Sequence, residues 1–387
     1  MENDMYALVN CDIYTGDGVQ YDKALVIDNG HIHGLVPLND LDASVNLRDL
    51  GGLCVAPGFI DTQVNGGGGI LFNDSPTVEG IERIVEAHRK FGTTNLLPTY
   101  ITGPPSGMAS AIDAVRTAIR DASVKGVLGI HLEGPFINEA KAGVHDKRFV
   151  REPNEEDLAL MCGPREGVMV VTVAPEVALA ETIERLSKAG VLVSLGHTNG
   201  TCEEAMRALT RGASCVTHLY NAMSALTSRA PGVVGAALDH RESWVGIIVD
   251  GFHSDFVSAR VAMRAKASRK MMLVTDAMPP VGIGESDAGF QLGDYKIHVE
   301  GGRCVTDDGV LAGSTLDMAT AVRNCVQKVG LPKDEALRMA STYPAEFLGL
   351  GAELGRIAPG YRANLTILNN QMVVSGVVVE GEYQEVA

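Results

Sequence analysis

Short apolar segments alternate with amphipathic, helix-like stretches through the middle of the chain, from about residue 57 to about residue 345. Short runs rich in β-branched residues are typical of buried strands, whereas apolar positions three or four apart are typical of helices. The expected strands are Gly58–Gln63, Thr94–Thr99, Val127–Glu133, Val168–Ala174, Val191–His197, Ser214–His218, Val245–Asp250 and Met271–Asp276. Because helical patterns such as Val78–Phe91 follow these strands, the segment predicts an α/β fold, a closed (β/α)8 TIM barrel rather than an open doubly wound sheet.

Both ends of the chain have strand character instead. The expected strands there are Met5–Val9, Ala24–Ile27, His31–Val36, Leu365–Leu368 and Val373–Val379. We therefore predict one small β-sandwich domain formed from residues 1–56 and 356–387, and a barrel domain over residues 57–355. Residues 289–313 interrupt the alternation with hairpin-like strands, Tyr295–Val299 and Gly302–Val305, and are interpreted as an insertion after the eighth strand.

Composition narrows the class of protein. The chain has 387 residues, and 32 basic against 48 acidic side chains give a net charge of −16, which argues against binding to nucleic acid or a membrane surface. No run approaches the roughly 18 apolar residues of a membrane helix. The acidic N-terminal segment lacks the pattern of a secretion signal, and the seven cysteines are scattered without a C-x-x-C pair. We therefore expect a cytoplasmic protein with reduced thiols.

Four of the expected strands end in a residue that can bind a metal ion or move a proton: Glu133, His197, His218 and Asp276. In a barrel all carboxyl ends of the strands face the same rim, where barrel enzymes keep their active sites. Two histidines and one carboxylate fit an open catalytic Zn²⁺ site, and a further carboxylate beside its water would act as a general base. The alternative for each residue alone is a hydrogen-bonded polar group at a strand end.

Several motifs resemble the amidohydrolase superfamily and, within it, the family of N-acetylglucosamine-6-phosphate deacetylases. The motifs are PGFIDTQVNG (57–66), HLEGPFIN (131–138), GHTN (196–199), THLYNAM (217–223), DGFH (250–253), VTDAM (274–278) and RIAPGYRANLTIL (356–368). The resemblance covers nearly the whole chain. It implies hydrolysis of the acetamide of N-acetyl-D-glucosamine 6-phosphate to glucosamine 6-phosphate and acetate, in amino-sugar catabolism and cell-wall sugar recycling.

Matched position by position, the resemblance implies that Glu133, His197 and His218 bind the metal. Asp276 would take a proton from water and deliver it to the leaving amine, and His145 would help to polarise the acetamide carbonyl.

The resemblance also implies how the sugar phosphate is bound. His253 would lie near the phosphate, and Arg229 would reach the phosphate bound by a neighbouring subunit, which implies a homodimer. Further expected substrate contacts are Val144, His145, Asn221, Ala222, Leu311, Ala312 and Gly313.

One departure from the wider superfamily concerns the metal. Many amidohydrolases carry His-x-His after the first barrel strand, where this chain has Gln63 and Asn65, which are weaker ligands for Zn²⁺. We therefore expect one divalent ion, Zn²⁺ first and Fe²⁺, Mn²⁺ or Co²⁺ as alternatives, with Gln63 able only to touch a weakly held second ion. His31 and His33 form a His-x-His sequence, but they lie in the N-terminal β segment, before the first barrel strand. We expect both side chains to be exposed on a hairpin there and not to bind the metal.

Alternatives remain at this stage. His131 could be a further ligand, although a hydrogen-bonded histidine one layer deeper in the barrel is the expected role. The substrate could be another N-acetylated amino-sugar phosphate, such as the galactosamine isomer. A cyclic-amide hydrolase of the dihydroorotase kind is disfavoured because Val168–Ala174 lacks a lysine, and a non-catalytic amidohydrolase-fold scaffold is disfavoured because the expected ligands are intact.

Overall fold

The computed structural model describes residues 5–267, 269–283 and 289–386. Residues 1–4 and 387, at the ends of the expected β domain, lie outside the described residues. The chain divides into two compact units, one of residues 5–61, 88–95 and 318–386, the other of residues 62–87 and 96–317.

The barrel sheet contains eight parallel strands that neighbour one another in chain order. They are β6 (Phe59–Val64), β9 (Thr93–Ile101), β10 (Gly129–Glu133), β11 (Val168–Val173), β12 (Leu192–Leu195), β13 (Ala213–Val216), β14 (Trp244–Ile247) and β15 (Met271–Leu273). A parallel bridge between Val64 and Ala277, with the Asp276 amide donating to the Gln63 carbonyl at 3.0 Å, joins the last strand to the first. The eight expected strands and the barrel are therefore confirmed.

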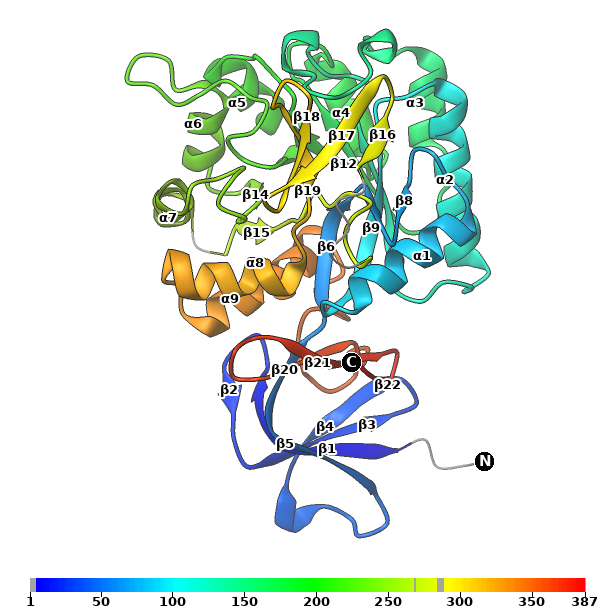
Figure 1. Ribbon diagram of the computed structural model, residues 1–387, viewed down its shortest axis with the longest axis vertical. Coiled ribbons are helices and arrows are strands. Elements are labelled where there is room, and N and C mark those ends of the chain that lie inside the picture. Colours follow the sequence, from blue (N-terminus) through cyan, green and yellow to red (C-terminus); the bar gives the residue numbers. More distant parts are fainter. Residues whose placement is uncertain (1–4, 268, 284–288, 387) are drawn as a thin grey trace. The chain divides into compact units, whose positions relative to one another are not determined.

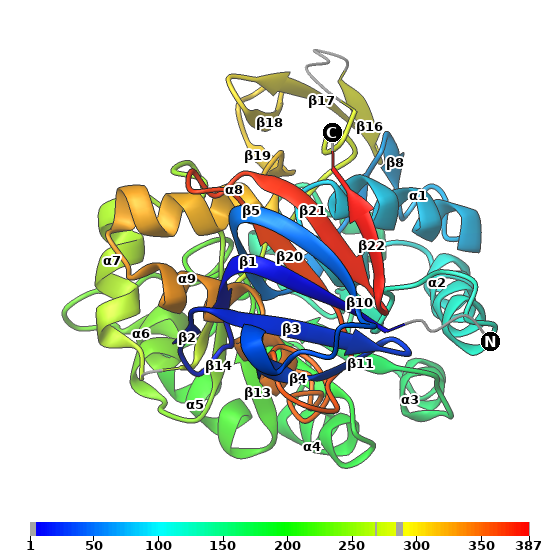
Figure 2. The same ribbon diagram turned by 90° about the horizontal axis from the view of Figure 1, so that it is seen from below.

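Helices surround the barrel strands (Figures 1 and 2). They are α1 (Val78–Arg89), α2 (Pro105–Arg120), α3 (Glu155–Cys162), α4 (Ala180–Lys188), α5 (Cys202–Thr210), α6 (Gly232–Asp239) and α7 (Phe256–Ala265). The sequence sets their starts locally: Thr201 and Glu204 form a reciprocal capping box at the start of α5, which satisfies backbone N–H groups that have no partner inside the helix. Among the described residues, no helix combines the length and apolar character needed to cross a membrane.

An insertion follows the last barrel strand, as expected. Its four strands form an antiparallel sheet in chain order: β16 (Phe290–Leu292), β17 (Tyr295–Glu300), β18 (Arg303–Thr306) and β19 (Leu311–Ser314). A short hairpin, β7 (Gly66–Gly67) and β8 (Ile70–Leu71), follows the first strand. Leu71, Ile297 and Met278 pack in one apolar cluster, so the insertion is fastened to the barrel by buried side chains.

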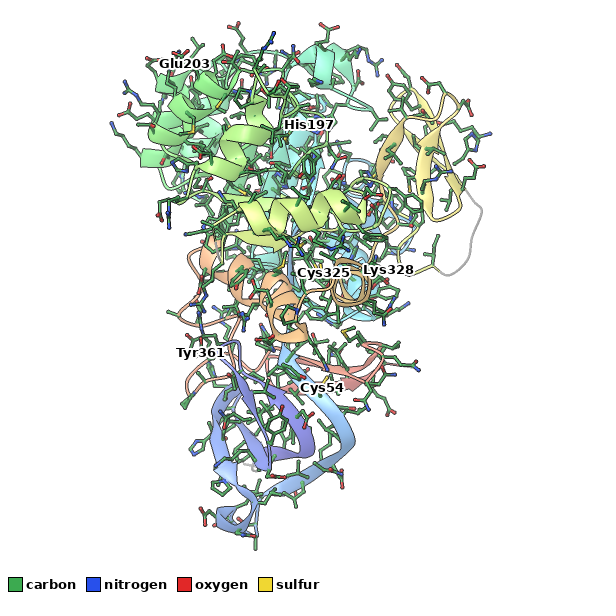
Figure 3. All side chains as sticks on the ribbon, turned by 90° about the vertical axis from the view of Figure 1, so that its left-hand side faces the viewer. Cys54, His197, Glu203, Cys325, Lys328 and Tyr361 are labelled. Carbon is green, nitrogen blue, oxygen red and sulfur yellow. The ribbon has the colours of Figure 1, made fainter. Side chains whose placement is uncertain are left out.

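The other unit contains a mixed sheet built from both ends of the chain, as expected. Its strand order is β22-β21-β20-β5-β1-β3-β4, with β2 paired to β1. The strands are β1 (Tyr6–Tyr14), β2 (Val19–Gln20), β3 (Lys23–Asp28), β4 (His31–Pro37), β5 (Asn46–Pro57), β20 (Leu365–Leu368), β21 (Val374–Val379) and β22 (Glu382–Glu385). Figure 2 shows β5, β1 and β3 side by side, and Figure 3 labels Cys54 of β5.

Alternation of side chains explains how this sheet is buried. Leu8 and Leu25 belong to one apolar cluster, whereas their chain neighbours Ala7 and Val26 belong to another, because successive side chains of a strand point to opposite faces. The same unit contains α8 (Met318–Asn324), the π-helical turn η4 (Cys325–Val329), α9 (Lys333–Ala340) and α10 (Thr342–Phe347). The expected domain boundaries at residues 56/57 and 355/356 stay a prediction.

The close pairing of β10 with β11, which positions Glu133, can be tested by substituting Gly129, the first residue of β10. A Cβ atom added there would collide with the backbone carbonyl of Val168 on β11, whereas a Cβ added at Gly34 in β4 meets no atom within 4 Å. We expect Gly129→Ala to lower the free energy of unfolding by about 1 to 3 kcal/mol, since backbone atoms must move to relieve the overlap. Thermal unfolding of Gly129→Ala beside the control Gly34→Ala measures this. Equal melting temperatures would show that β10 and β11 are not packed this closely.

Candidate active site

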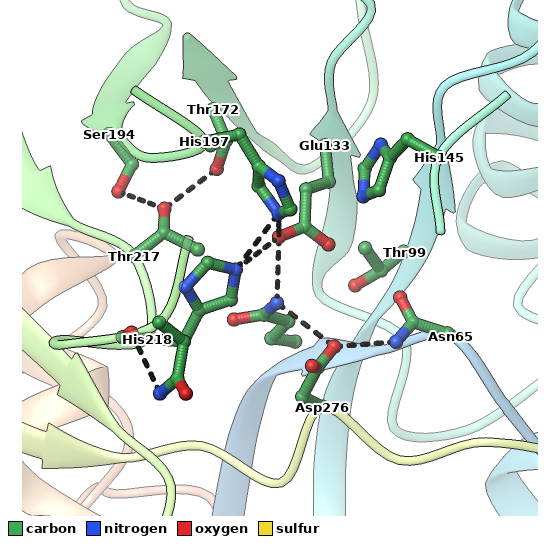
Figure 4. Close-up of polar contacts among 12 residues, drawn as sticks. Asn65, Thr99, Glu133, His145, Thr172, Ser194, His197, Thr217, His218 and Asp276 are labelled. Atoms are coloured by element: carbon green, nitrogen blue, oxygen red, sulfur yellow. Dashed lines mark hydrogen bonds and ion pairs between the residues drawn. The ribbon is translucent and has the colours of Figure 1, made fainter. Parts of the chain in front are cut away.

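The expected metal ligands meet at one rim of the barrel (Figure 4). Glu133 is the last residue of β10, while His197 and His218 lie two residues beyond the ends of β12 and β13. The latter two adopt positive φ angles, 47° and 26°, which non-glycine residues rarely do. The sequence predicted that these residues close their strands. The structure corrects this detail: the backbone leaves the sheet first, and the turn aims both rings at Glu133.

The three donor side chains form one tight group. Their candidate ligand atoms all lie within 4.8 Å of one another. Oε1 of Glu133 is 2.9 Å from Nε2 of His218 and 3.3 Å from Nε2 of His197, and the two Nε2 atoms are 3.1 Å apart. Two imidazole nitrogens and a carboxylate oxygen converging on one point are the donor set of a catalytic zinc site.

The electrostatics of this group favour a cation. Burial by itself raises the pKa of Glu133, but hydrogen bonds from His197 and His218 outweigh it and hold that pKa well below its usual range. Burial lowers the pKa of His218, but the Glu133 carboxylate outweighs burial and the pKa is raised. The donors thus stabilise positive charge at the point where they meet, as a metal site must.

The orientation of His197 also fits a metal ligand. Its Nδ1 lies 2.8 Å from the carbonyl oxygen of Lys141, which can only accept a hydrogen bond. When a metal takes the place of the bond between Nε2 and Glu133, Nδ1 would therefore carry the proton of the neutral ring, and Nε2 would give its lone pair to the metal.

Asp276 faces the donor group from the end of the last strand, three residues beyond β15 and again with a positive φ, 53°. Its Oδ1 accepts hydrogen bonds from Nδ2 of Asn65 at 2.6 Å and Nε2 of Gln63 at 3.1 Å. Gln63 also donates to Oε1 of Glu133 at 3.0 Å and so connects the two carboxylates. Burial, with the nearby charge of Glu133, raises the pKa of Asp276, which suits a general base.

His145 is held against the metal ligands. Its ring centre is 4.3 Å from that of His197, and its Nδ1 is 2.8 Å from Oγ1 of Thr102. Burial, with neighbouring His197, lowers the pKa of His145 to about 3, so the ring is neutral near pH 7. Because Thr102 occupies Nδ1, Nε2 is the nitrogen left for a substrate.

A cavity of about 490 Å³ lies over the donor group. Most of the expected site residues line it: Glu133, Val144, His145, His197, His218, Asn221, Ala222, His253, Asp276, Leu311 and Gly313. Gln63 and Ala312 are buried and do not line the cavity, and Arg229 is exposed on a loop and does not line it either. The insertion contributes Leu292 of β16, Gly309 and Val310 of the turn before β19, and Leu311 and Gly313 of β19 to the wall.

At the rim of the cavity, His253 is held by Asp250. Nδ1 of His253 lies 2.7 Å from Oδ2 of Asp250, whose Oδ1 accepts the backbone N–H of His253 at 2.8 Å. Burial raises the pKa of Asp250, but the bond from His253 outweighs it and the pKa is lowered. Nε2 of His253 is therefore the ring nitrogen available to a ligand.

The structure also shows where the other histidines considered as metal ligands lie. His131 lies beneath the site, 3% exposed, with Nε2 2.7 Å from Oγ1 of Thr172, and it is not in the donor group. His31 and His33 are exposed on β4, as expected. Three residues that contact the site residues were not predicted. Asn65 donates a hydrogen bond to Asp276, Thr102 is hydrogen-bonded to His145, and the carbonyl of Lys141 orients His197. Only Asn65, which follows β6 two residues after Gln63, had a signal in the sequence, as the second position of the missing His-x-His motif.

Comparison with known proteins agrees with this geometry. A model of the amidohydrolase family matches residues 54–383, and a model described as the NagA composite domain matches residues 5–55. The N-acetylgalactosamine-6-phosphate deacetylase of Shewanella sp. (strain ANA-3) is 46% identical, over 84% of this chain and 82% of that protein.

Two solved structures share the whole fold. The crystal structure of N-acetylglucosamine-6-phosphate deacetylase from Pasteurella multocida is 39% identical, with a TM-score of 0.94, and covers 98% of this chain and 100% of that one. A mutant of the enzyme of the same name from Mycobacterium smegmatis, in complex with N-acetyl-D-glucosamine-6-phosphate, is 29% identical over 98% of both chains, with a TM-score of 0.88. From its barrel, its metal-type donor group and these matches, the chain belongs to the amidohydrolase family.

Proposed function

We propose that this protein is a metal-dependent hydrolase that converts N-acetyl-D-glucosamine 6-phosphate to D-glucosamine 6-phosphate and acetate. The observation that carries the proposal is the convergence of Glu133, His197 and His218 on one point, with Asp276 facing them inside a cavity of about 490 Å³. The relatives that act on N-acetylated amino-sugar phosphates support the substrate class. We further propose that the protein acts in the cytoplasm, in amino-sugar catabolism or cell-wall sugar recycling.

An amide resists hydrolysis because water is a weak nucleophile and the amine is a poor leaving group. A divalent ion held by Glu133, His197 and His218 supplies a water of lowered pKa and a Lewis acid for the carbonyl. Oδ1 of Asp276 is engaged by Asn65 and Gln63, so Oδ2 takes the proton of the attacking water and returns it to the leaving nitrogen. His145 donates from Nε2 to the carbonyl oxygen. In this proposed tautomer Nδ1 carries no proton and accepts from the hydroxyl of Thr102, whose Oγ1 is 2.8 Å away.

The ion is proposed to be Zn²⁺, with Fe²⁺, Mn²⁺ or Co²⁺ as alternatives that the same donors accept. One ion is proposed because Gln63 directs its N–H groups, and not its oxygen, at the two carboxylates. A second, weakly held ion would require the Gln63 amide to turn.

The phosphate end of the substrate needs local cations, because the chain carries a net charge of −16. We assign His253 to this end, with Val144, Asn221, Ala222 and residues 311–313 of β19 as further contacts. Arg229 is exposed outside the cavity of its own chain, which supports its proposed role in a homodimer, reaching the phosphate bound by a second copy. Leu226 on the same loop is 55% exposed, and Val257 and Val261 on one side of α7 are 60% and 55% exposed, as expected of a surface that a second copy covers.

The galactosamine isomer is a second candidate substrate. The relative that is 46% identical bears that name, and the two sugars differ only in the configuration at carbon 4. A non-catalytic scaffold is disfavoured because the complete donor group and Asp276 are in place.

The first experiment is acetate release by Zn²⁺-loaded protein from N-acetylglucosamine 6-phosphate, its unphosphorylated form and N-acetylgalactosamine 6-phosphate. We expect release from the glucosamine phosphate at a kcat/KM at least about tenfold above the other two, since a lost phosphate contact or a misplaced hydroxyl costs more than about 1.4 kcal/mol. A preference for the galactosamine phosphate would reassign the substrate. Release from none would contradict the proposed reaction.

Asp276→Asn separates proton transfer from metal binding. We expect kcat to fall by about 10²- to 10⁴-fold, because an amide cannot accept the proton, while the zinc content stays near that of wild type. Glu133→Gln is expected to lower the zinc content itself, since it removes the anionic donor. Chelation of wild-type protein should abolish turnover, and added Zn²⁺ should restore it. Near wild-type kcat in Asp276→Asn would remove Asp276 from the role of base.

Arg229→Ala tests the shared phosphate site. We expect KM for the phosphorylated substrate to rise by about 10- to 100-fold with little change in kcat, because a charged hydrogen bond worth about 1.5 to 3 kcal/mol is lost. Arg241→Ala, another exposed arginine that does not line the cavity, is the matched control. An unchanged KM in Arg229→Ala would exclude Arg229 from phosphate binding.

A further inference from the structure

A row of buried hydroxyl groups lies beneath the candidate metal donors. Oγ of Ser194 is 2.6 Å from Oγ1 of Thr217, which is 2.7 Å from Oγ1 of Thr172. Oγ1 of Thr172 is in turn 2.7 Å from Nε2 of His131. All four side chains are at most 4% exposed, and Figure 4 shows the three hydroxyl groups beside His197 and His218. We call Ser194, Thr217, Thr172 and His131 the hydroxyl row.

Each member of the hydroxyl row is tied to a metal donor through the backbone. His131 lies two residues before Glu133 on β10, and Thr172 is the register partner of Glu133 on β11. Ser194 lies on β12, three residues before His197, and Thr217 directly precedes His218. The row therefore links side chains from all three segments that carry donors.

The two donor histidines are held in different ways. His197 is fixed by the bond between its Nδ1 and the carbonyl of Lys141. Nδ1 of His218 is buried and has no hydrogen bond to another residue in the described part of the chain. A metal-bound histidine usually gives this second nitrogen to an acceptor that sets the ring orientation. For His218 the backbone of the residue itself is the acceptor at hand, so no other described residue supports the ring at this nitrogen.

The residue before His218 supplies that support. The backbone N–H of Thr217 donates to the carbonyl of Leu195 at 2.9 Å, and its side chain is held between Ser194 and Thr172. His218 then turns out of the sheet with a φ of 26°, a conformation that persists only where its surroundings enforce it. Because Thr217 is anchored by both its backbone and its hydroxyl, the start of this turn is fixed.

The geometry points to Thr217 as a positioning residue of the metal centre: its hydroxyl, held in the hydroxyl row, fixes His218 against Glu133 and His197. The inference rests on the proposed metal centre. Valine at position 217 keeps the shape of the side chain but removes a donor and an acceptor from the middle of the row. Serine keeps the hydroxyl and loses only a methyl group.

The test is the affinity of the full-length, metal-free protein for Zn²⁺, measured by competition with a chromogenic chelator. We expect Thr217→Val to raise the Kd for Zn²⁺ by about 10- to 100-fold, the usual effect of losing a group that orients a ligand, and Thr217→Ser to stay within about threefold of wild type. Co²⁺-loaded Thr217→Val should show shifted visible absorption bands, because these bands report the arrangement of the ligands.

Thr366→Val is the matched control for loss of a buried hydroxyl. Thr366 is fully buried on β20 in the other compact unit, and its Oγ1 donates to the carbonyl of Gly92 at 2.6 Å. This variant should lose a similar amount of stability and keep the wild-type Kd for Zn²⁺, which separates a general loss of stability from a change at the metal centre. If Thr217→Val does not fold, Thr172→Val breaks the same row and carries the same expectation.

The outcomes of this test distinguish the two proposals. If wild-type protein does not bind Zn²⁺, the proposed metal centre is wrong. If wild-type protein binds Zn²⁺ and Thr217→Val has the same Kd and the same Co²⁺ spectrum, the metal centre stands and Thr217 has no positioning role. A tenfold or larger rise in the Kd of Thr217→Val, together with a near wild-type Kd for Thr217→Ser, supports the positioning role.

Discussion

One oxygen atom, Oε1 of Glu133, is the point on which the functional geometry depends. His218, Gln63 and His197 lie 2.9, 3.0 and 3.3 Å from it. Gln63 lies on β6, and the two histidines follow the ends of β13 and β12. A buried carboxylate surrounded in this way stays ionised although burial opposes its charge. The strand ends must therefore be held to within a fraction of an ångström, since a displaced donor would leave a buried charge without a partner. The barrel closure between Val64 and Ala277 and the hydroxyl row both serve this requirement.

The two carboxylates at the rim are given opposite tasks by their surroundings. Glu133 receives bonds from two imidazoles and has a lowered pKa, as suits a metal ligand. Asp276 receives amide bonds from Gln63 and Asn65 and has a raised pKa, as suits a group that exchanges a proton. Gln63 donates to both, so one neutral side chain sets their separation. This explains physically why glutamine can stand at a position where a histidine would bind a second ion.

The sequence predicted the eight barrel strands because each is a short apolar run followed by a helical pattern, and it predicted the donors because they follow those runs. It placed His197, His218 and Asp276 at the strand ends but not beyond them, since the positive φ angles of these residues arise from the packing around each turn. For the same reason, the sequence could not predict hydrogen bonds to the site residues from backbone groups or from residues distant in the chain. His197 is oriented by the carbonyl of Lys141, and His145 is hydrogen-bonded to the hydroxyl of Thr102. Both partners lie on loops whose path no local sequence pattern predicts. The twelve-residue strand β5 was also missed, because Gly51 and Gly52 interrupt its pattern.

The insertion after β15 has a consequence for how this enzyme class can change. The segment that carries Asp276 is paired on one side to Gln63 and on the other to Ser314, whose backbone N–H donates to the Asp276 carbonyl at 2.9 Å. Ser314 ends β19, and the turn that precedes β19 forms part of the cavity wall. The proposed base and part of the cavity wall thus lie on two paired segments of backbone. A mutation that reshapes residues 309–313 for a different sugar would also shift the backbone that positions Asp276, so new specificities on this scaffold should arise together with altered kcat.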